Sequence, residues 1–253
     1  MTIKFLTDYP ALFIPDKKIL VVAELHIGLE YELYKSGIVI SPQVEKFQKI
    51  LNNLIKTTKA KVLVIIGDTK HEVPGISFRE LKEIPKLFSH LVEIIDVIIV
   101  KGNHDTFLED AIPTEIKTYS SRGLKIEKYG FFHGHAWPSK KLMDCDHLFM
   151  AHLHPLIEFK DKLGHRSIQQ VWIKSALDKE LIKNKYKVEK TGRLEITILP
   201  TFNKLLGGLI LNKTEEELHG PLFSNKILDM DKSNMYLLDG TLLGTIKDLK
   251  KFE

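Results

Sequence analysis

The stretch Lys61-Val62-Leu63-Val64-Ile65-Ile66-Gly67-Asp68-Thr69-Lys70-His71 contains the two features on which the fold prediction rests. After Lys61, the next five residues are a short apolar run rich in β-branched side chains, which is typical of a buried strand. The run ends at Gly67-Asp68, and a histidine follows three residues later. The sequence therefore predicts a buried strand with polar, titratable side chains at its carboxyl end.

The segments on either side of this stretch repeat the pattern. Residues 18–23 and 94–100 are also predicted as buried strands. A helix is expected from Ser41-Pro42, a typical helix start, to about Ile55. Ser77 and Glu80 have capping-box spacing and predict a second helix, which Pro85 is expected to break or kink. Strands that alternate with helices in this way favour parallel pairing with helices covering the sheet.

The second half of the chain is richer in short strands separated by glycines and polar turns. The expected strands are residues 129–132, 147–151, 171–173, 194–199 and 235–239. Gly207-Gly208 and residues 242–244 are interpreted as late β-structure. The fold class expected is α/β (α+β), with two sheets packed together and helices outside, in a single domain over residues 1–253.

Composition excludes several classes of protein. The chain has 253 residues, 43% of them hydrophobic, a single cysteine and a net charge of +4. One cysteine, Cys145, excludes an intramolecular disulfide and a cysteine-based zinc cluster. No apolar run reaches the roughly 20 residues of a membrane helix, and residues 1–5 do not resemble a secretory signal. A reducing, cytoplasmic compartment and no membrane partner are therefore expected.

The charge is uneven along the chain. Residues 158–193 hold ten Lys and Arg against five Asp and Glu, a net of +5 that exceeds the charge of the whole chain. A solvated surface is the simpler interpretation of this segment. The alternative is a surface that contacts a phosphate backbone, which leaves nucleic acid open as a partner.

Five clusters of metal-capable side chains each follow an apolar run. Seven of the eleven histidines lie in these clusters. Ligands bind beyond the carboxyl ends of strands in open α/β sheets, so five such strand ends would form one site. The clusters are Glu24-Leu25-His26, Gly67-Asp68-Thr69-Lys70-His71, Gly102-Asn103-His104-Asp105, His133-Gly134-His135 and His152-Leu153-His154.

The donor types in these clusters suit first-row divalent ions, with manganese expected first and iron, zinc or nickel as alternatives. Seven candidate ligands are too many for one tetrahedral zinc, but they fit two ions that share a carboxylate. Two cations of this kind can clamp a phosphoester and activate a shared water molecule. The candidate metal ligands are Glu24, His26, Asp68, Asn103, His133, His152 and His154.

The ordered clusters resemble the calcineurin-like metallophosphoesterases, whose blocks run Asp-x-His, Gly-Asp-x-x, Gly-Asn-His-Asp/Glu, His and Gly-His-x-His. The resemblance covers roughly residues 18–160. It implies a four-layer αββα sandwich of two mixed sheets, with a di-metal centre at one edge. Within this superfamily, residues 67–71 and the late Leu199-Pro200-Thr201-Phe202-Asn203 with Gly207-Gly208 look like the archaeal SbcD-related phosphoesterases.

The resemblance also implies a role for each matching residue. Asp68 would bridge the two ions. Glu24, His26 and His154 would complete one ion's ligands, and Asn103, His133 and His152 the other's. His104 would protonate or stabilise the leaving oxygen, with Asp105 orienting its ring. His71 and His135, which lie beside ligands, are interpreted as contacts to the substrate phosphate or as partners of the ligands.

Two positions depart from the family pattern. Glu24 stands where the family has Asp, and Ala151 stands where it has Gly. The longer carboxylate offers the same oxygens with altered geometry, whereas Ala151 lacks the freedom of glycine at φ > 0. The function expected is a metal-dependent phosphoesterase that acts on an unidentified phosphoester, with a nucleic acid or nucleotide phosphodiester as a candidate. The alternative is a catalytically weak or inactive member that binds metal and acts as a scaffold.

The remaining residues of interest have simpler interpretations. His90, His147, His165 and His219 lie outside the clusters and are expected to be structural or exposed. Cys145 is expected to be a small packing residue rather than a reactive thiol.

Overall fold

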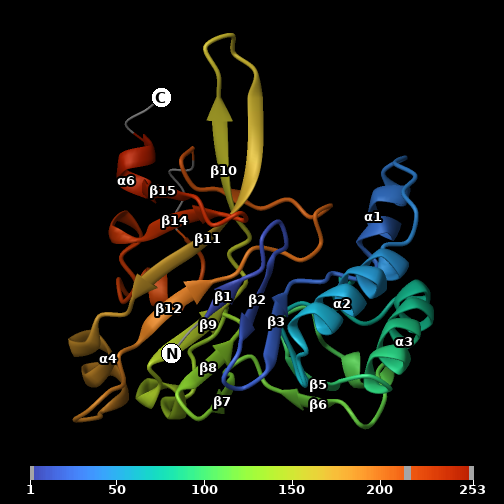
Figure 1. Ribbon diagram of the computed structural model, residues 1–253, viewed down its shortest axis with the longest axis horizontal. Coiled ribbons are helices and arrows are strands. Elements are labelled where there is room, and N and C mark those ends of the chain that lie inside the picture. Colours follow the sequence, from blue (N-terminus) through green and yellow to red (C-terminus); the bar gives the residue numbers. More distant parts are fainter. Residues whose placement is uncertain (1–2, 214–217, 251–253) are drawn as a thin grey trace.

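The computed structural model describes residues 3–213 and 218–250 and consists of two packed β-sheets with helices on their outer faces (Figure 1). The first sheet, within these residues, has six strands in the order β1-β2-β3-β4-β5-β6, and β3 to β6 are parallel. Its strands are β1 (Lys4–Phe5), β2 (Ala11–Ile14), β3 (Ile19–Ala23), β4 (Val62–Ile66), β5 (Asp96–Val100) and β6 (Lys117–Tyr119).

The second sheet takes up the later strands of the described chain, in the order β13-β10-β11-β12-β9-β8-β7, with β14 on β11 and β15 on β14. Strands β8, β9 and β12 are parallel, so their carboxyl ends lie at one edge. Its strands are β7 (Leu124–Ile126), β8 (Tyr129–Phe132), β9 (His147–Met150), β10 (Pro155–Lys160), β11 (Arg166–Ala176), β12 (Glu195–Ile198), β13 (Leu209–Ile210), β14 (Asn234–Leu237) and β15 (Leu242–Thr245).

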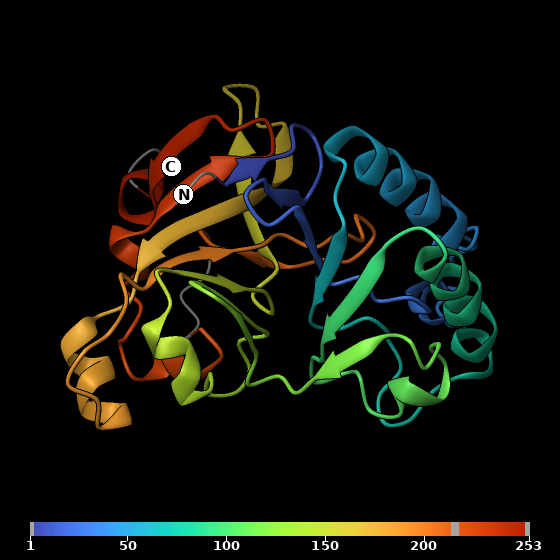
Figure 2. The same ribbon diagram turned by 60° about the horizontal axis from the view of Figure 1, so that its bottom comes forward.

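The helices form the two outer layers. Figure 2 shows α2 and α3 over the first sheet and α4 on the opposite side of the molecule. Short 3₁₀ segments connect several strands. The helices are α1 (Leu29–Lys35), α2 (Val44–Thr58), α3 (Phe78–Val92), α4 (Lys179–Tyr186), α5 (Pro221–Ser224) and α6 (Ile246–Leu249), and the 3₁₀ segments are η1 (Leu108–Asp110), η2 (Lys140–Asp144) and η3 (Met230–Lys232).

Three apolar cores hold the layers together. One lies between the first sheet and helices α2 and α3, and another covers the outer face of the second sheet. The third joins the inner faces of both sheets and includes Val64 and Ile66 of β4 together with Phe131, Phe149 and Trp172 of the second sheet. These three interfaces confirm the expected four-layer αββα sandwich, since burial of one face of each sheet against the other is what fixes the layers.

Local differences from the sequence prediction have physical reasons. Helix α3 begins with the predicted Ser77–Glu80 capping box, but Pro85 lies inside it and does not end it. The helix continues because Ile84, Leu87 and Phe88 are fully buried against the first sheet. Helix α2 starts at Val44 with Gln43 as its N-cap, two residues later than the cap expected at Ser41.

The hairpin of β10 and β11 is the most prominent projection of the molecule and is drawn in yellow in Figure 1. Strand β11 has 11 residues, so its two ends lie roughly 35 Å apart. The basic segment 158–193 is therefore divided: Lys160, Lys162 and Arg166 lie at the hairpin end, and the lysines of α4 follow the other end. It does not form one continuous basic surface.

None of the helices in the described ranges combines the length and the apolar character that a bilayer-spanning segment requires.

Candidate metal centre

The five clusters of the sequence come together at one edge of the two sheets. Strands β3, β4 and β5 deliver the loops of Glu24, Asp68 and His104, and the parallel strands β8 and β9 deliver those of His133 and His152. Four residues of this set have backbone angles in the left-handed region, which residues other than glycine rarely adopt. They are Glu24 (φ 57°), His26 (φ 41°), His152 (φ 68°) and His154 (φ 47°).

Glu24 lies at the centre of the cluster and is fully buried. Its Oε2 atom is 3.0 Å from Nε2 of His26 and 3.1 Å from Nε2 of His154. Its Oε1 atom is 2.9 Å from Nε2 of His133 and accepts a 2.9 Å hydrogen bond from the main-chain N–H of His152. The two oxygens of one carboxylate thus face two different groups of histidines.

Asp68 supplies a second carboxylate at the same place. Its Oδ1 atom accepts a 2.8 Å hydrogen bond from the main-chain N–H of His104. Its Oδ2 atom is 3.7 Å from Nε2 of His26, 3.8 Å from Nε2 of His133 and 3.9 Å from Nε2 of His104. Asp68 Oδ2 is therefore nearly equidistant from histidines of both predicted ligand groups.

Two glycines make this crowding sterically feasible. A Cβ atom on Gly67 would lie 2.2 Å from Cδ2 of His133 and 2.6 Å from Oε1 of Glu24. A Cβ atom on Gly102 would lie 1.9 Å from Oδ1 of Asp68. All three distances are too short for non-bonded atoms, so glycine is needed at both positions for packing, and at Gly67 (φ 77°) for backbone freedom as well.

The electrostatics of the cluster favour neutral His26 and His152 beside an ionised Glu24, whereas Glu24 raises the pKa of the buried His133. Burial lowers the pKa of His26 to about 4 and, together with His133, lowers the pKa of His152 to about 3. Burial acts to raise the pKa of Glu24, but the neighbouring His133 and His154 hold it well below the ordinary value. Burial and the nearby Glu24 raise the pKa of Asp68 to about 7. Two adjacent buried carboxylates repel each other, and a cation between them relieves that repulsion.

The donor set fits divalent cations. Among the described residues, ligand atoms within 4.8 Å of one another occur in three sets. One holds histidines alone, His26, His71 and His104, and two include carboxylates: Glu24, His26 and His154, and Glu24, Asp68 and His133. Nε2 of His154 is buried and makes no hydrogen bond, although it lies 3.1 Å from Glu24. A buried imidazole nitrogen without a hydrogen bond, aimed at a carboxylate, is the arrangement expected of a metal ligand.

The other two expected ligands lie at the margin of the cluster. The His152 ring is partly buried, and its centroid is 4.7 Å from that of His133. Asn103 is exposed on the loop between Gly102 and His104. Their roles as metal ligands stay predictions. Ala151 is fully buried and its φ is not positive, because the positive φ falls on His152 instead, so this departure from the family pattern is accommodated.

The His104 ring is oriented by a main-chain carbonyl. Its Nδ1 atom donates a 2.6 Å hydrogen bond to the carbonyl oxygen of His71, which leaves Nε2 on the side of Asp68. The expectation that Asp105 orients this ring is wrong. The Asp105 carboxylate is buried and accepts hydrogen bonds from the main-chain N–H groups of Thr69, Lys70 and Gly102 at 2.8, 3.1 and 2.9 Å. Asp105 therefore connects the loop that carries Asp68 to the loop after β5, in which Asp105 itself lies.

His71 and His135 each contact the Nδ1 atom of a ligand histidine. The Nδ1 atoms of His71 and His26 are 3.1 Å apart, and those of His135 and His133 are 2.6 Å apart. The other ring nitrogen of His71, Nε2, is hydrogen-bonded to the carboxylate of Glu32 in helix α1. Metal-binding histidines usually have a partner on their second nitrogen, and here that partner is another histidine. Of the two interpretations of these residues, the geometry favours partners of the ligands.

Residues that sequence reasoning missed hold the ligand loops in place. Glu80, the capping-box residue of α3, also accepts hydrogen bonds from the main-chain N–H groups of His71 and Glu72 at 2.7 Å each. Asn203 donates from its side chain to the carbonyl of Leu25 at 3.1 Å. A Cβ atom on Gly208 would lie 2.0 Å from the carbonyl oxygen of His154. The late segment that follows β12 thus supports two of the ligand loops, a role that only its contacts reveal.

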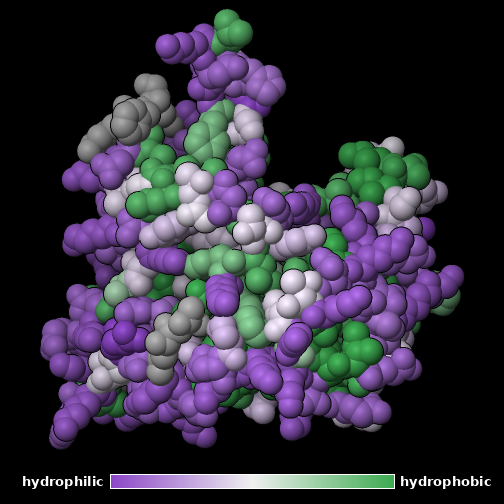
Figure 3. Space-filling model, in the orientation of Figure 1, coloured by the Kyte–Doolittle hydropathy of each residue, from purple (hydrophilic) through white to green (hydrophobic). Residues whose placement is uncertain are grey.

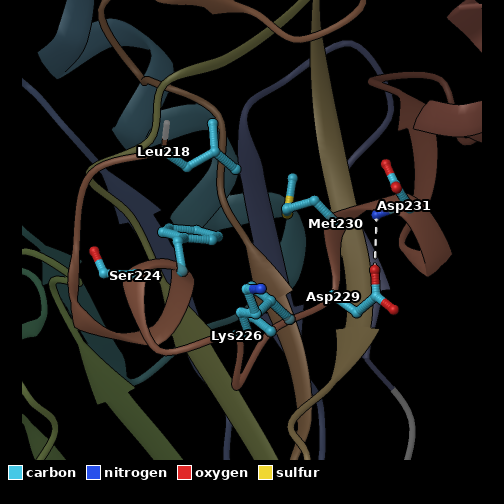
Figure 4. Close-up of a pocket in the computed structure, with 8 residues that line it drawn as sticks. Leu218, Ser224, Lys226, Asp229, Met230 and Asp231 are labelled. Carbon is cyan, nitrogen blue, oxygen red and sulfur yellow. Dashed lines mark hydrogen bonds between the residues drawn. The ribbon is translucent and has the colours of Figure 1, made fainter. Parts of the chain in front are cut away.

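The remaining histidines and the cysteine lie elsewhere. Nε2 of His90 is hydrogen-bonded to Oδ1 of Asn52, and His165 and His219 are exposed. Cys145 is buried, and burial raises the pKa of its thiol to about 11, which agrees with a packing role. A separate pocket beside α5 and η3 is shown in Figure 4, where Asp229 accepts a 3.1 Å hydrogen bond from the N–H of Asp231. This pocket shares no residue with the histidine cluster.

Comparison with known proteins identifies the family and the fold. Residues 17–192 match the family model described as calcineurin-like phosphoesterase. Among solved structures, the nuclease MPE of Pseudomonas putida is similar in fold, with a TM-score of 0.58, 18% sequence identity and 92% of each chain covered. A search of curated protein sequences gave no significant match. The narrower likeness to archaeal SbcD-related enzymes stays a prediction.

Proposed function

The chain belongs to the calcineurin-like phosphoesterase family, and we propose that it hydrolyses phosphoester bonds with two divalent cations. The observation that carries the proposal is the convergence of two carboxylates, Glu24 and Asp68, with His26 and with histidines from two other loops at one sheet edge. The Glu24–His26–His154 set and the Glu24–Asp68–His133 set would each hold one ion. Manganese is the first candidate and iron, zinc and nickel are alternatives, since all accept mixed carboxylate and imidazole ligands.

Bound at this edge, the cations would polarise the phosphoryl group and lower the pKa of a water molecule they share. The protein itself supplies orientation. Because Nδ1 of His104 is occupied by the carbonyl of His71, Nε2 is the nitrogen available to give a proton to a leaving oxygen. With 27% of its side chain exposed, His104 is more accessible than His26 and His133, which are buried.

The surroundings of the site favour an extended phosphodiester. Hairpin β10–β11 starts at Pro155, the residue after His154, and α1 starts three residues after His26. Figure 3 shows the hairpin and α1 as two projections with a hollow between them. The hairpin end carries the exposed Lys160, Lys162 and Arg166. We therefore propose nucleic acid as the substrate class, held near the site by phosphate contacts to the hairpin.

The experiment that tests the function uses protein stripped with a chelator and reconstituted with Mn²⁺. We expect metal-dependent hydrolysis of bis-p-nitrophenyl phosphate, and loss of that activity in the Asp68→Asn variant. For the substrate class, the triple variant Lys160→Ser/Lys162→Ser/Arg166→Ser should bind oligonucleotides more weakly and with a shallower salt dependence, and should hydrolyse the small diester normally. Absence of turnover with every metal would refute the hydrolase. Equal oligonucleotide binding by the triple variant would refute the hairpin contact.

The alternative, a metal-binding scaffold without turnover, rests on Glu24 in place of the family's Asp. The carboxylate of Glu24 lies within 3.1 Å of Nε2 of His26, His133 and His154. The longer side chain therefore still reaches the histidines, and we favour the hydrolase.

A further inference from the structure

We propose that Glu24 bridges the two metal ions, as a second bridging carboxylate beside Asp68. This inference rests on the proposed function only in assuming that two cations bind. It goes beyond the family resemblance, in which the residue at this position serves one ion alone.

The first argument is the division of the two oxygens. Oε2 of Glu24 faces His26 and His154, which are expected ligands of one ion. Oε1 faces His133, an expected ligand of the other ion, at 2.9 Å. Neighbouring ligand atoms on one metal, each about 2.1 Å from it, lie roughly 3.0–3.4 Å apart. The contacts of both Glu24 oxygens are close to this range, so each oxygen lies where a ligand of the same ion as its histidines would lie.

The second argument is the length and fixed position of the side chain. Glutamate has one more methylene than aspartate, and this places the carboxylate between the histidine groups rather than beside one of them. The main-chain N–H of His152 holds Oε1 on the His133 side. The absence of a Cβ at Gly67 leaves room for the same oxygen, because a methyl group there would lie 2.6 Å from it. The carboxylate is fully buried, which restricts it to this orientation.

The third argument is the complementary position of Asp68. Its single atom Oδ2 is 3.7 Å from Nε2 of His26 and 3.8 Å from Nε2 of His133, so it also faces both groups. Asp68 would bridge through the single atom Oδ2, and Glu24 would bridge through both of its carboxylate oxygens. Both negative charges would then be shared by both ions, which predicts that the ions bind cooperatively, since each one reduces the carboxylate repulsion felt by the empty site.

The test isolates one ion at a time. His154→Ala removes a ligand of the first group only, and titration of that variant with Mn²⁺ by calorimetry reports the ion on the His133 side. We then add Glu24→Gln, which keeps the size of the side chain. If Glu24 bridges, the double variant binds the remaining ion at least about tenfold more weakly than His154→Ala alone. The reciprocal pair, His133→Ala with and without Glu24→Gln, should show a similar loss for the other ion.

The outcomes separate this inference from the proposed function. If Glu24→Gln leaves Mn²⁺ affinity unchanged in the His154→Ala background, Glu24 serves one ion only and the bridge is refuted, while the hydrolase proposal stands. If the unsubstituted protein binds no divalent ion, both proposals fail. Thermal melting of each metal-free variant checks folding, and low-temperature electron paramagnetic resonance of the two-manganese form is expected to show spin coupling that Glu24→Gln alters.

Discussion

The Nδ1 atom of His104 donates a hydrogen bond of 2.6 Å to the main-chain carbonyl oxygen of His71, 33 residues earlier in the chain. The bond joins the loop after β5 to the loop after β4 and fixes the position of the His104 ring. Because Nδ1 carries the proton of this bond, Nε2 is the nitrogen that can gain or lose a proton. His71 itself is held by main-chain and side-chain contacts to Glu80 and Glu32. The orientation of the proposed proton donor thus depends on two helices, α1 and α3.

Replacement of His104 by alanine should lower the rate of metal-dependent diester hydrolysis by about 10²–10⁴ if the ring acts as a general acid. Binding of Mn²⁺ should change little, because His104 belongs to neither of the two candidate metal sets that contain a carboxylate. His165→Ala, which removes an exposed histidine on the hairpin, serves as the control in the small-diester assay. An unchanged rate for His104→Ala would remove the proton-donor role.

Replacement of Asp105 by asparagine should destabilise the fold. The carboxylate accepts three main-chain hydrogen bonds while buried, and the amide would turn an N–H group toward at least one of these donors. A loss of about 1–3 kcal/mol in the free energy of unfolding is expected from one unsatisfied buried group. Urea denaturation of the metal-free protein measures it, with the exposed Asp110→Asn as control. An unchanged urea midpoint would contradict the anchoring role.

The adjacent glycines Gly207 and Gly208 offer a matched pair of substitutions. A Cβ on Gly208 would lie 2.0 Å from the carbonyl oxygen of His154, whereas a Cβ on Gly207 has no neighbour within 4 Å. Gly208→Ala should displace the His154 loop, weaken Mn²⁺ binding and lower stability by about 1–3 kcal/mol, and Gly207→Ala should stay within about 0.5 kcal/mol. Thermal melting and Mn²⁺ titration test both variants. Equal behaviour of the two would show that the late segment does not support the site.

Uptake of metal should depend on pH through Asp68. Its pKa of about 7 means that the metal-free site holds a proton there below pH 7, and a cation must displace it. His26 and His152, with pKa values of about 4 and 3, are already neutral at pH 6 and contribute no proton. His133, whose pKa is raised by Glu24 against the effect of burial, adds to the release. Affinity for Mn²⁺ should therefore fall as pH falls below 7.

Calorimetry in buffers of different ionisation enthalpy measures this proton release. We expect at least about one proton released per protein at pH 6 and much less at pH 8, with affinity falling roughly tenfold per pH unit for each proton displaced. Equal proton release at the two pH values would contradict the assignment to Asp68.

The strands and the layers were predictable because they depend on local patterns. A buried strand such as β4 needs a continuous apolar run, and Ile65 and Ile66 lie in such a run whatever surrounds them. Helix α3 shows the limit of this reasoning. Local chemistry predicted its capping box, yet Pro85 did not end it, since packing of Ile84 and Phe88 on the sheet outweighs the lost hydrogen bond.

The basic segment 158–193 shows the same limit for function. Its charges are close in sequence, but β11 carries them to opposite ends of an extended strand. An extended strand advances about 3.3 Å per residue, so basic residues that are close in sequence do not form one continuous basic surface. The partners of His71, His104 and Asp105 were also beyond sequence reasoning, because each contact joins loops more than 30 residues apart or uses a main-chain atom.

By itself, the sequence determined which residue types would end the strands, and therefore that carboxylates and imidazoles would meet at one sheet edge. That follows from strand polarity, which any chain with this order of elements shares. Only the tertiary structure decided how those groups face one another: that the two oxygens of Glu24 point to different histidines, and that Asp105 binds main-chain N–H groups instead of His104. The physical reason is that directions of side chains in a buried cluster are set by close packing and hydrogen-bond satisfaction among distant segments, which no local pattern contains.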